Sequence, residues 1–191
     1  LLDLVDYGET ALTTAMQITY QTKQNLCMNL AEYAFSPGVS ALAGAWAGRP
    51  AVVVAAGPSL GPQLPLLKGA QGKVAILCVG TALKPCLRAG VVPDLVTTID
   101  YSRLSAKYLE GLPGGCAVPL VVDPRGNWQA VEGYPGPKYF LQNPYLDLLL
   151  DHALGPAASA SLDTGGTVAH LTYSLACLMG ADPVIFVGLD L

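Results

Sequence analysis

The chain has 191 residues, of which 52% are apolar and only 13% are charged, and its net charge is −4 at neutral pH. It contains no basic run, which excludes nucleic acid as a main partner because phosphate neutralisation requires clustered Lys and Arg. No stretch reaches the ~18 consecutive apolar residues of a membrane span, and the first residues lack the features of a signal peptide. We therefore expect an α/β domain with a large core, in a cytoplasmic protein that contacts no membrane.

The cysteines also favour a cytoplasmic location. They are odd in number, widely spaced and without a C-x-x-C pair, at Cys27, Cys78, Cys86, Cys116 and Cys177. This spacing fits neither a zinc site nor a disulfide framework, so we predict reduced and mostly buried thiols.

The first predicted element is helical and covers residues 3–35, as one long helix or two stacked helices. This segment has no proline and only one glycine, and Ser36-Pro37-Gly38 ends it. A short linker of small residues follows at 41–48. Residues 1–48 thus form an N-terminal helical segment, and residues 49–191 form the main domain.

From residue 49 onward, short apolar runs typical of buried strands alternate with helix-forming stretches. The strands are predicted at Ala51–Ala56, Val74–Val79, Leu95–Ile99, Val118–Val122, Lys138–Leu141 and Val184–Val187. The helices are predicted at Leu64–Lys68, Ala82–Ala89, Ser102–Leu109, Pro144–Leu154 and Thr167–Met179, with long loops at 111–115 and 124–137. This alternation predicts a Rossmann-like α/β fold, in which a mainly parallel sheet is flanked by helices.

In an open parallel sheet, ligands bind beyond the carboxyl ends of the strands. Glycine or polar residues follow nearly every predicted strand, and the candidates are Gly57, Pro58, Ser59, Leu60, Thr81, Asp100, Asp123 and Asp190. They predict a ring of ligand-binding groups around one crevice.

The turn at Gly57-Pro58-Ser59-Leu60 has neither the G-x-G-x-x-G nor the P-loop spacing. The missing P-loop lysine excludes a Walker-type NTPase. Glycine after a strand allows a ligand to approach the backbone, and Ser59 can cap the following helix. An ordinary strand-to-helix turn is the alternative interpretation.

A second glycine turn, Thr164-Gly165-Gly166-Thr167, comes directly before a helical run. Free amides at the start of a helix bind phosphate without lysine, because the helix dipole places partial positive charge there. A capped helix with a glycine entry is the alternative interpretation.

The remaining candidates are weaker. His170 shares a helix face with Thr167 and is a weak candidate for a catalytic base, a packed or surface histidine being the alternative; His152 is weaker still. Asp100 and Asp123 would bind ribose hydroxyls or a metal, or cap a helix. Arg125, with Asn127 and Trp128, would form part of a lid or only a surface loop.

Four motifs, in this order, resemble one protein family. They are PAVVVAAGPSL at 50–60, GVVPDLVTTID at 90–100, GGTVAH at 165–170 and GADPVIFVGLDL at 180–191. The chain from about Asn25 onward resembles the domain shared by bacterial motility-associated factor (Maf) glycosyltransferases and the archaeal 6-hydroxymethylpterin diphosphokinase MptE. A more distant similarity is to bacterial sialyltransferases that use a CMP-sugar donor.

The similarity to the sialyltransferases implies roles for the candidate residues. The turn from Gly57 to Ser59 would contact the nucleotide, Thr81 and Asp100 would lie beside the base or sugar, and the turn from Thr164 to Gly166 would hold the donor's charged groups. The histidine base of those enzymes lies beyond their Gly-x-Asp motif. We therefore expect the base of this protein beyond Leu191, and further domains on either side.

The leading hypothesis is a Maf-type glycosyltransferase that acts in flagellin glycosylation and motility. It would move a nonulosonic, sialic-acid-like sugar from a CMP donor to a Ser or Thr hydroxyl of flagellin, without an obligatory metal or cofactor. One alternative is an ATP-dependent 6-hydroxymethylpterin diphosphokinase, with Mg²⁺ held by Asp100, Asp123 and Asp190. Another is a nucleotide-binding module without catalysis.

Overall fold

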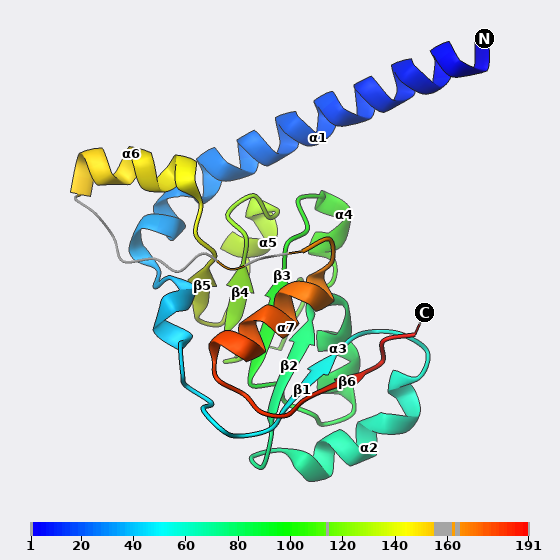
Figure 1. Ribbon diagram of the computed structural model, residues 1–191, viewed down its shortest axis with the longest axis vertical. Coiled ribbons are helices and arrows are strands. Elements are labelled where there is room, and N and C mark those ends of the chain that lie inside the picture. Colours follow the sequence, from blue (N-terminus) through cyan, green and yellow to red (C-terminus); the bar gives the residue numbers. More distant parts are fainter. Residues whose placement is uncertain (1, 114, 155–161, 163–164, 191) are drawn as a thin grey trace.

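The computed structural model describes the backbone of residues 2–113, 115–154, 162 and 165–190. Its centre is a six-stranded sheet with the strand order β5-β4-β3-β2-β1-β6, and each pair of neighbours is parallel (Figure 1). The strands are β1 (Ala51–Val54), β2 (Ala75–Val79), β3 (Leu95–Thr98), β4 (Leu120–Val122), β5 (Lys138–Phe140) and β6 (Val184–Val187). The predicted Rossmann-like α/β fold is confirmed.

Helices precede and connect these strands, as the alternating pattern predicted. They are α1 (Leu2–Phe35), α2 (Leu60–Ala70), α3 (Gly80–Arg88), α4 (Arg103–Ala106), α5 (Trp128–Glu132), α6 (Pro144–Leu154) and α7 (Val168–Leu178), with a 3-10 turn η1 (Val39–Leu42). Residues 2–35 form one continuous helix rather than two. The short helix α5 interrupts the loop expected over 124–137, because the Asn127 side chain accepts a hydrogen bond from the Ala130 amide at 3.0 Å and caps it.

Side chains of the strands alternate between two cores, one on each face of the sheet. Val52, Ile76 and Val96 pack on the face covered by α2, α3 and α5. Ala51, Leu77 and Leu95 pack on the opposite face against Leu171 and Leu175 of α7. Because both faces are covered, the strands read as continuous apolar runs, which explains the high apolar content.

The strand β6 departs from this pattern. It is an edge strand paired with β1, and its Ile185 and Phe186 are 49% and 43% exposed. The prediction of a buried strand was therefore wrong here, because strand order rather than local composition decides which strand lies at the edge. The cysteines also depart in part from the predicted burial. All five thiols are free, but those of Cys27 and Cys177 are exposed.

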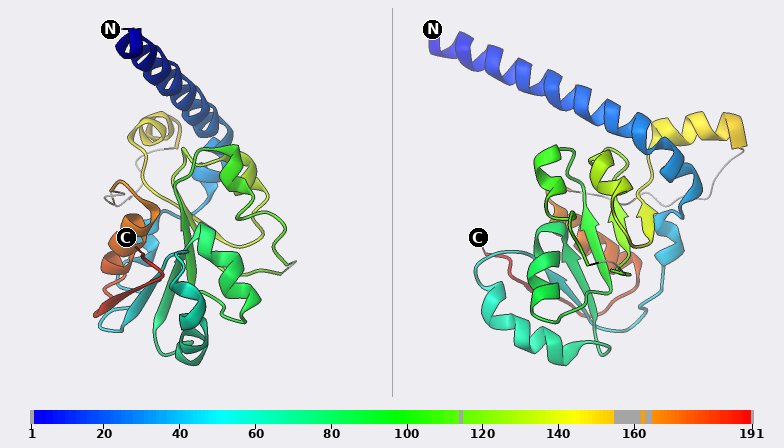
Figure 2. Two further views of the ribbon diagram at one scale, coloured as in Figure 1. Left: turned by 90° about the vertical axis from the view of Figure 1, so that its right-hand side faces the viewer. Right: turned by 180° about the vertical axis from the view of Figure 1, so that it is seen from behind.

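Helix α1 has two different halves. Its C-terminal half packs against α5 and α6, whereas its N-terminal half extends away from the sheet (Figures 1 and 2). Met16, in the extended half, and Tyr20, just after it, are 66% and 71% exposed. None of the helices in the described part of the chain combines the length and apolarity needed to cross a bilayer.

Candidate functional site

The strand order reverses beside β1, and this reversal marks the candidate site. From β1 the chain passes through β2, β3 and β4 to β5 on one side, and then returns to place β6 on the other side of β1. In open α/β sheets, ligands bind in the crevice that such a reversal opens beyond the carboxyl ends of the strands. Gly57 follows β1 and Gly188 follows β6, so both lie at this position.

The start of α7 lies at the same edge of the sheet. Thr172, in the first half of α7, shares a 2.6 Å hydrogen bond with Thr97 in the second half of β3. At the other end of α7, the Leu178 and Met179 carbonyls accept hydrogen bonds from Gly44 and Trp46, which precede β1. The helix therefore runs from the carboxyl edge to the amino edge, and its N-terminus faces the crevice side.

The first glycine turn is closed by the chain that follows β6. The Gly57 amide donates to the Gly188 carbonyl at 2.8 Å, and the Ser59 amide and hydroxyl both donate to Asp190 Oδ2 at 3.0 Å. A Cβ on Gly57 would lie 2.0 Å from Asp190 Oδ2 and 2.6 Å from the Gly188 carbonyl oxygen, so only glycine fits. Leu60 is buried beneath the turn and Pro58 is exposed on it.

Asp190 determines what the first turn can bind. The Ser59 hydroxyl donates its hydrogen bond to the Asp190 carboxylate. Ser59 therefore stands at the start of α2 without making the capping hydrogen bond that the sequence predicted. A phosphate at this turn would face that carboxylate and be repelled. The turn is suited instead to hydroxyl or amine donors, such as those of a ribose or a base.

The second glycine turn lies at the start of α7, where backbone amides are available. Thr167 caps α7 by accepting a hydrogen bond from the His170 amide at 3.2 Å, and the preceding amides at a helix start have no acceptor within the helix. A Cβ on Gly166 would meet no atom within 4 Å, so space is open beside it. Part of the predicted turn, Thr164, lies outside the described residues.

The weak candidate for a base, His170, lies near the start of α7. It is exposed, and its ring packs against Gly165, where an added Cβ would lie 2.3 Å from the His170 Cγ. Gly165 has the left-handed φ of +52° that favours glycine. Within the described part of the chain, no carboxylate bonds to the ring to orient it. The other histidine, His152, has a side chain outside the described part.

Thr81 and Asp100 follow the next two strands along the sheet from β1. Thr81 is half-buried in the first turn of α3, after β2. Asp100 is exposed after β3, and partial desolvation raises the pKa of its carboxyl. They lie one and two strands from β1, or about 5 and 10 Å away along the sheet edge.

Asp123 forms an ion pair with Arg125, two residues further along the same loop. The Arg125 guanidinium holds it in a fork, with Nε at 2.9 Å from Oδ1 and Nη2 at 2.6 Å from Oδ2, and this pairing raises the pKa of Arg125. The Arg125 amide also donates to Oδ1 at 2.8 Å. Asp123 is only 4% exposed, so no ligand or metal reaches it freely.

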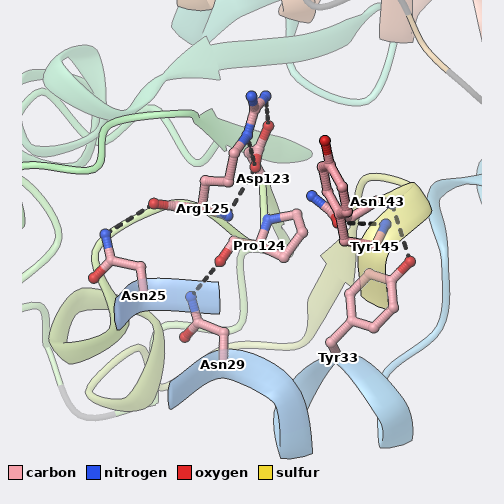
Figure 3. Close-up of polar contacts among 8 residues, drawn as sticks. All are labelled: Asn25, Asn29, Tyr33, Asp123, Pro124, Arg125, Asn143 and Tyr145. Atoms are coloured by element: carbon pink, nitrogen blue, oxygen red, sulfur yellow. Dashed lines mark hydrogen bonds and ion pairs between the residues drawn. The ribbon is translucent and has the colours of Figure 1, made fainter. Parts of the chain in front are cut away.

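Two buried asparagines of α1 hold the same loop from below (Figure 3). Asn29 Nδ2 donates to the Pro124 and Gly126 carbonyls at 2.9 and 3.0 Å. Asn25 Nδ2 donates to the Arg125 and Tyr101 carbonyls at 2.8 and 3.0 Å. The sequence analysis missed this pair, although two Asn residues four apart in a helix do indicate a polar stripe on one face.

The predicted ring of strand-end residues is therefore a row spread along the carboxyl edge of the sheet. β4 lies three strands from β1, so Asp123 stands about 14 Å along the edge from the first glycine turn. In the described part of the chain, Asp100, Asp123 and Asp190 do not gather into a cluster that could hold a metal. The reason is the strand order, which the alternation of strands and helices does not determine.

Comparison with known proteins agrees with this architecture. A family model described as 6-hydroxymethylpterin diphosphokinase MptE-like matches residues 24–191. A solved structure of a Maf glycosyltransferase from Magnetospirillum magneticum AMB-1 has the same fold, with a TM-score of 0.67 and 20% sequence identity. The similarity covers 88% of this chain and 27% of that chain, so this chain spans about a quarter of the enzyme's length. No curated protein sequence matches this chain.

Proposed function

The chain belongs to the 6-hydroxymethylpterin diphosphokinase MptE-like family, and on this basis we propose that it transfers a group from a nucleotide-activated donor. The donor is a CMP-linked nonulosonic sugar, and the acceptor is a protein hydroxyl such as Ser or Thr of flagellin. The Maf glycosyltransferase that shares the fold over 88% of this chain supports a sugar as the transferred group.

The helix start at α7 is the observation that carries the proposal. The amides of Thr167, Val168 and Ala169 precede the first complete helical turn, and open space lies beside Gly166. Such amides stabilise the anion that leaves when the bond between the sugar and CMP breaks, and they need no metal to do so. No Lys or Arg stands within either glycine turn, so backbone amides are the anion-binding groups available there.

The two turns divide the nucleotide between them in this proposal. The first turn, with Asp190 against Ser59, holds hydroxyl or amine groups of the ribose or base. The second turn holds the phosphate. The acceptor hydroxyl also needs a base, and His170, whose ring lies on Gly165 without a carboxylate partner in the described part of the chain, is not assigned that role.

A diphosphokinase is the second candidate, because the family model carries that description. Transfer of pyrophosphate from ATP normally uses Mg²⁺ held by carboxylates. Asp123 is paired with Arg125 and Asp190 with Ser59, which leaves Asp100 as the carboxylate of the three without such a partner. This arrangement favours the glycosyltransferase over the diphosphokinase.

A thermal shift experiment with CMP, CTP, ATP and ATP plus Mg²⁺ distinguishes the candidates. A ligand at a hundred times its Kd adds ~2.7 kcal/mol to the free energy of unfolding. We expect CMP to raise the melting temperature without metal. A rise only with ATP and Mg²⁺ would replace the glycosyltransferase by the diphosphokinase, and no rise with any ligand would leave a module without nucleotide binding.

A further inference from the structure

A hollow of about 740 Å³ lies outside the crevice, between the C-terminal half of α1, the loop after β4 and the start of α6. Its apolar lining comes from both helices, with Leu26 and Leu30 from α1 and Leu146 and Leu149 from α6. Leu149 is 60% exposed, and Tyr145 beside it is 75% exposed. Exposed apolar side chains gathered in a hollow of this size are typical of a binding site.

Two basic side chains line this groove. Among the described residues, its lining includes Lys23 and Arg125 but no Asp or Glu, although the whole chain has 14 acidic and 10 basic residues. Arg125 has five N–H groups, and two of its nitrogens are engaged by Asp123, so donors remain on a side chain that is 52% exposed. In the described part of the chain, Lys23 has no carboxylate partner.

The position of Arg125 is fixed before any ligand arrives. Asp123 orients its guanidinium, and Asn25 and Asn29 hold the carbonyls of its loop. Figure 3 shows the side chains of Arg125 and Tyr145 directed to the same side, away from the two asparagines. A fixed guanidinium loses little conformational freedom on binding an anion.

We propose that this groove binds an organic anion with an apolar body. The carboxylate or phosphate head group contacts Arg125 and Lys23, and the apolar body lies on the leucines of α1 and α6. The groove follows β4 and β5, three to four strands from β1, or about 14 to 19 Å along the sheet edge from the first glycine turn. Its lining includes no residue of either glycine turn, and the proposal does not rest on the proposed function.

Displacement of the fluorescent anion 8-anilinonaphthalene-1-sulfonate from the full chain tests this proposal. Octanoate and octyl phosphate compete as carboxylate and phosphate probes, and octanol is their uncharged counterpart. We expect at least one anion to displace the dye at a concentration about tenfold lower than octanol does. The anion that binds more tightly identifies the head group. If octanol displaces the dye at the same concentration as both anions do, the proposal is overturned.

Charge-reversed variants locate the site. Lys23→Glu is expected to weaken binding of the anion about tenfold or more. Lys73→Glu makes the same change at an exposed lysine between α2 and β2, away from the groove, and is expected to leave binding unchanged. Both lysines are exposed, so both variants are expected to fold, which circular dichroism checks. Equal effects of the two variants would contradict the proposed site. No nucleotide is present, so failure here leaves the donor site untouched.

Discussion

The two ends of the sheet's carboxyl edge are built in different ways. Beside β1 and β6, glycine backbone packs against backbone, and one side chain, Asp190, reaches the turn at Ser59. Beside β4, the loop is held by side chains of Asn25 and Asn29, which lie 95 to 100 residues earlier in the chain. The first arrangement is built from short contacts of the backbone and one carboxylate, whereas the second fixes one cationic side chain in place.

The largest expected effect is at the β4 end, in Asn29→Asp. The variant replaces the buried amide that donates to the Pro124 and Gly126 carbonyls by a carboxylate that faces them. We expect the free energy of unfolding to fall by about 4 kcal/mol, because two carbonyls lose their donor and a buried charge has no partner. Urea unfolding measures this loss. Gln24→Glu, on the exposed side of the same helix, is the control, with a change within about 0.5 kcal/mol. A similar loss in both variants would contradict a specific role of the Asn29 hydrogen bonds in holding the loop after β4.

A smaller effect is expected at the β1 end, in Gly57→Ala. The added Cβ would meet Asp190 Oδ2 and the Gly188 carbonyl oxygen, at 2.0 and 2.6 Å. The carboxylate can rotate away but the backbone oxygen cannot, so we expect a loss of about 1–3 kcal/mol in urea unfolding. Gly61→Ala, in α2 with no atom within 4 Å, is expected to stabilise the helix by up to about 1 kcal/mol. Equal outcomes for the two variants would contradict the close packing at Gly57.

The smallest effect depends on pH and concerns Tyr33 of α1. Its hydroxyl donates to Asp147 Oδ1 and accepts from the Asn143 amide at 3.1 Å. Burial, followed by the hydrogen bond to Asp147, raises the pKa of Tyr33 to about 12. The folded protein thus holds this proton more tightly than the unfolded chain, and the contribution is complete below the ordinary pKa of ~10 and lost as the pH rises toward 12.

Tyr33→Phe tests this sign. We expect the variant to be less stable by about 1–2 kcal/mol at pH 8, and the difference to shrink as the pH rises from about 10. Urea unfolding at several pH values measures both. A difference that stays constant across that range would show that the hydroxyl does not titrate as described.

The positions of the two glycine turns were predictable from the sequence, and the contacts at the β4 end were not. Both turns are local patterns that can be recognised from neighbouring residues alone. In the first, glycine comes directly after an apolar run, and in the second, a Gly-Gly pair comes directly before a helical run. The roles of Asn25 and Asn29 depend on the path that brings α1 beneath the β4 loop, and nothing near them in the sequence specifies that path. The spread of the predicted ring along the sheet edge likewise follows from the strand order, which places Asp123 three strands from Gly57.

Calorimetric titration of CMP into the chain and two valine variants tests the central claim, that the start of α7 binds the nucleotide phosphate. A Cβ added at Gly166 or at Gly69 would meet no atom within 4 Å, so the two variants are matched in the space around the substituted position. We expect the unaltered chain to bind CMP without metal, Gly166→Val to lose about tenfold or more in affinity, and Gly69→Val to bind normally. CMP binding to Gly166→Val as tight as to the unaltered chain would contradict the claim.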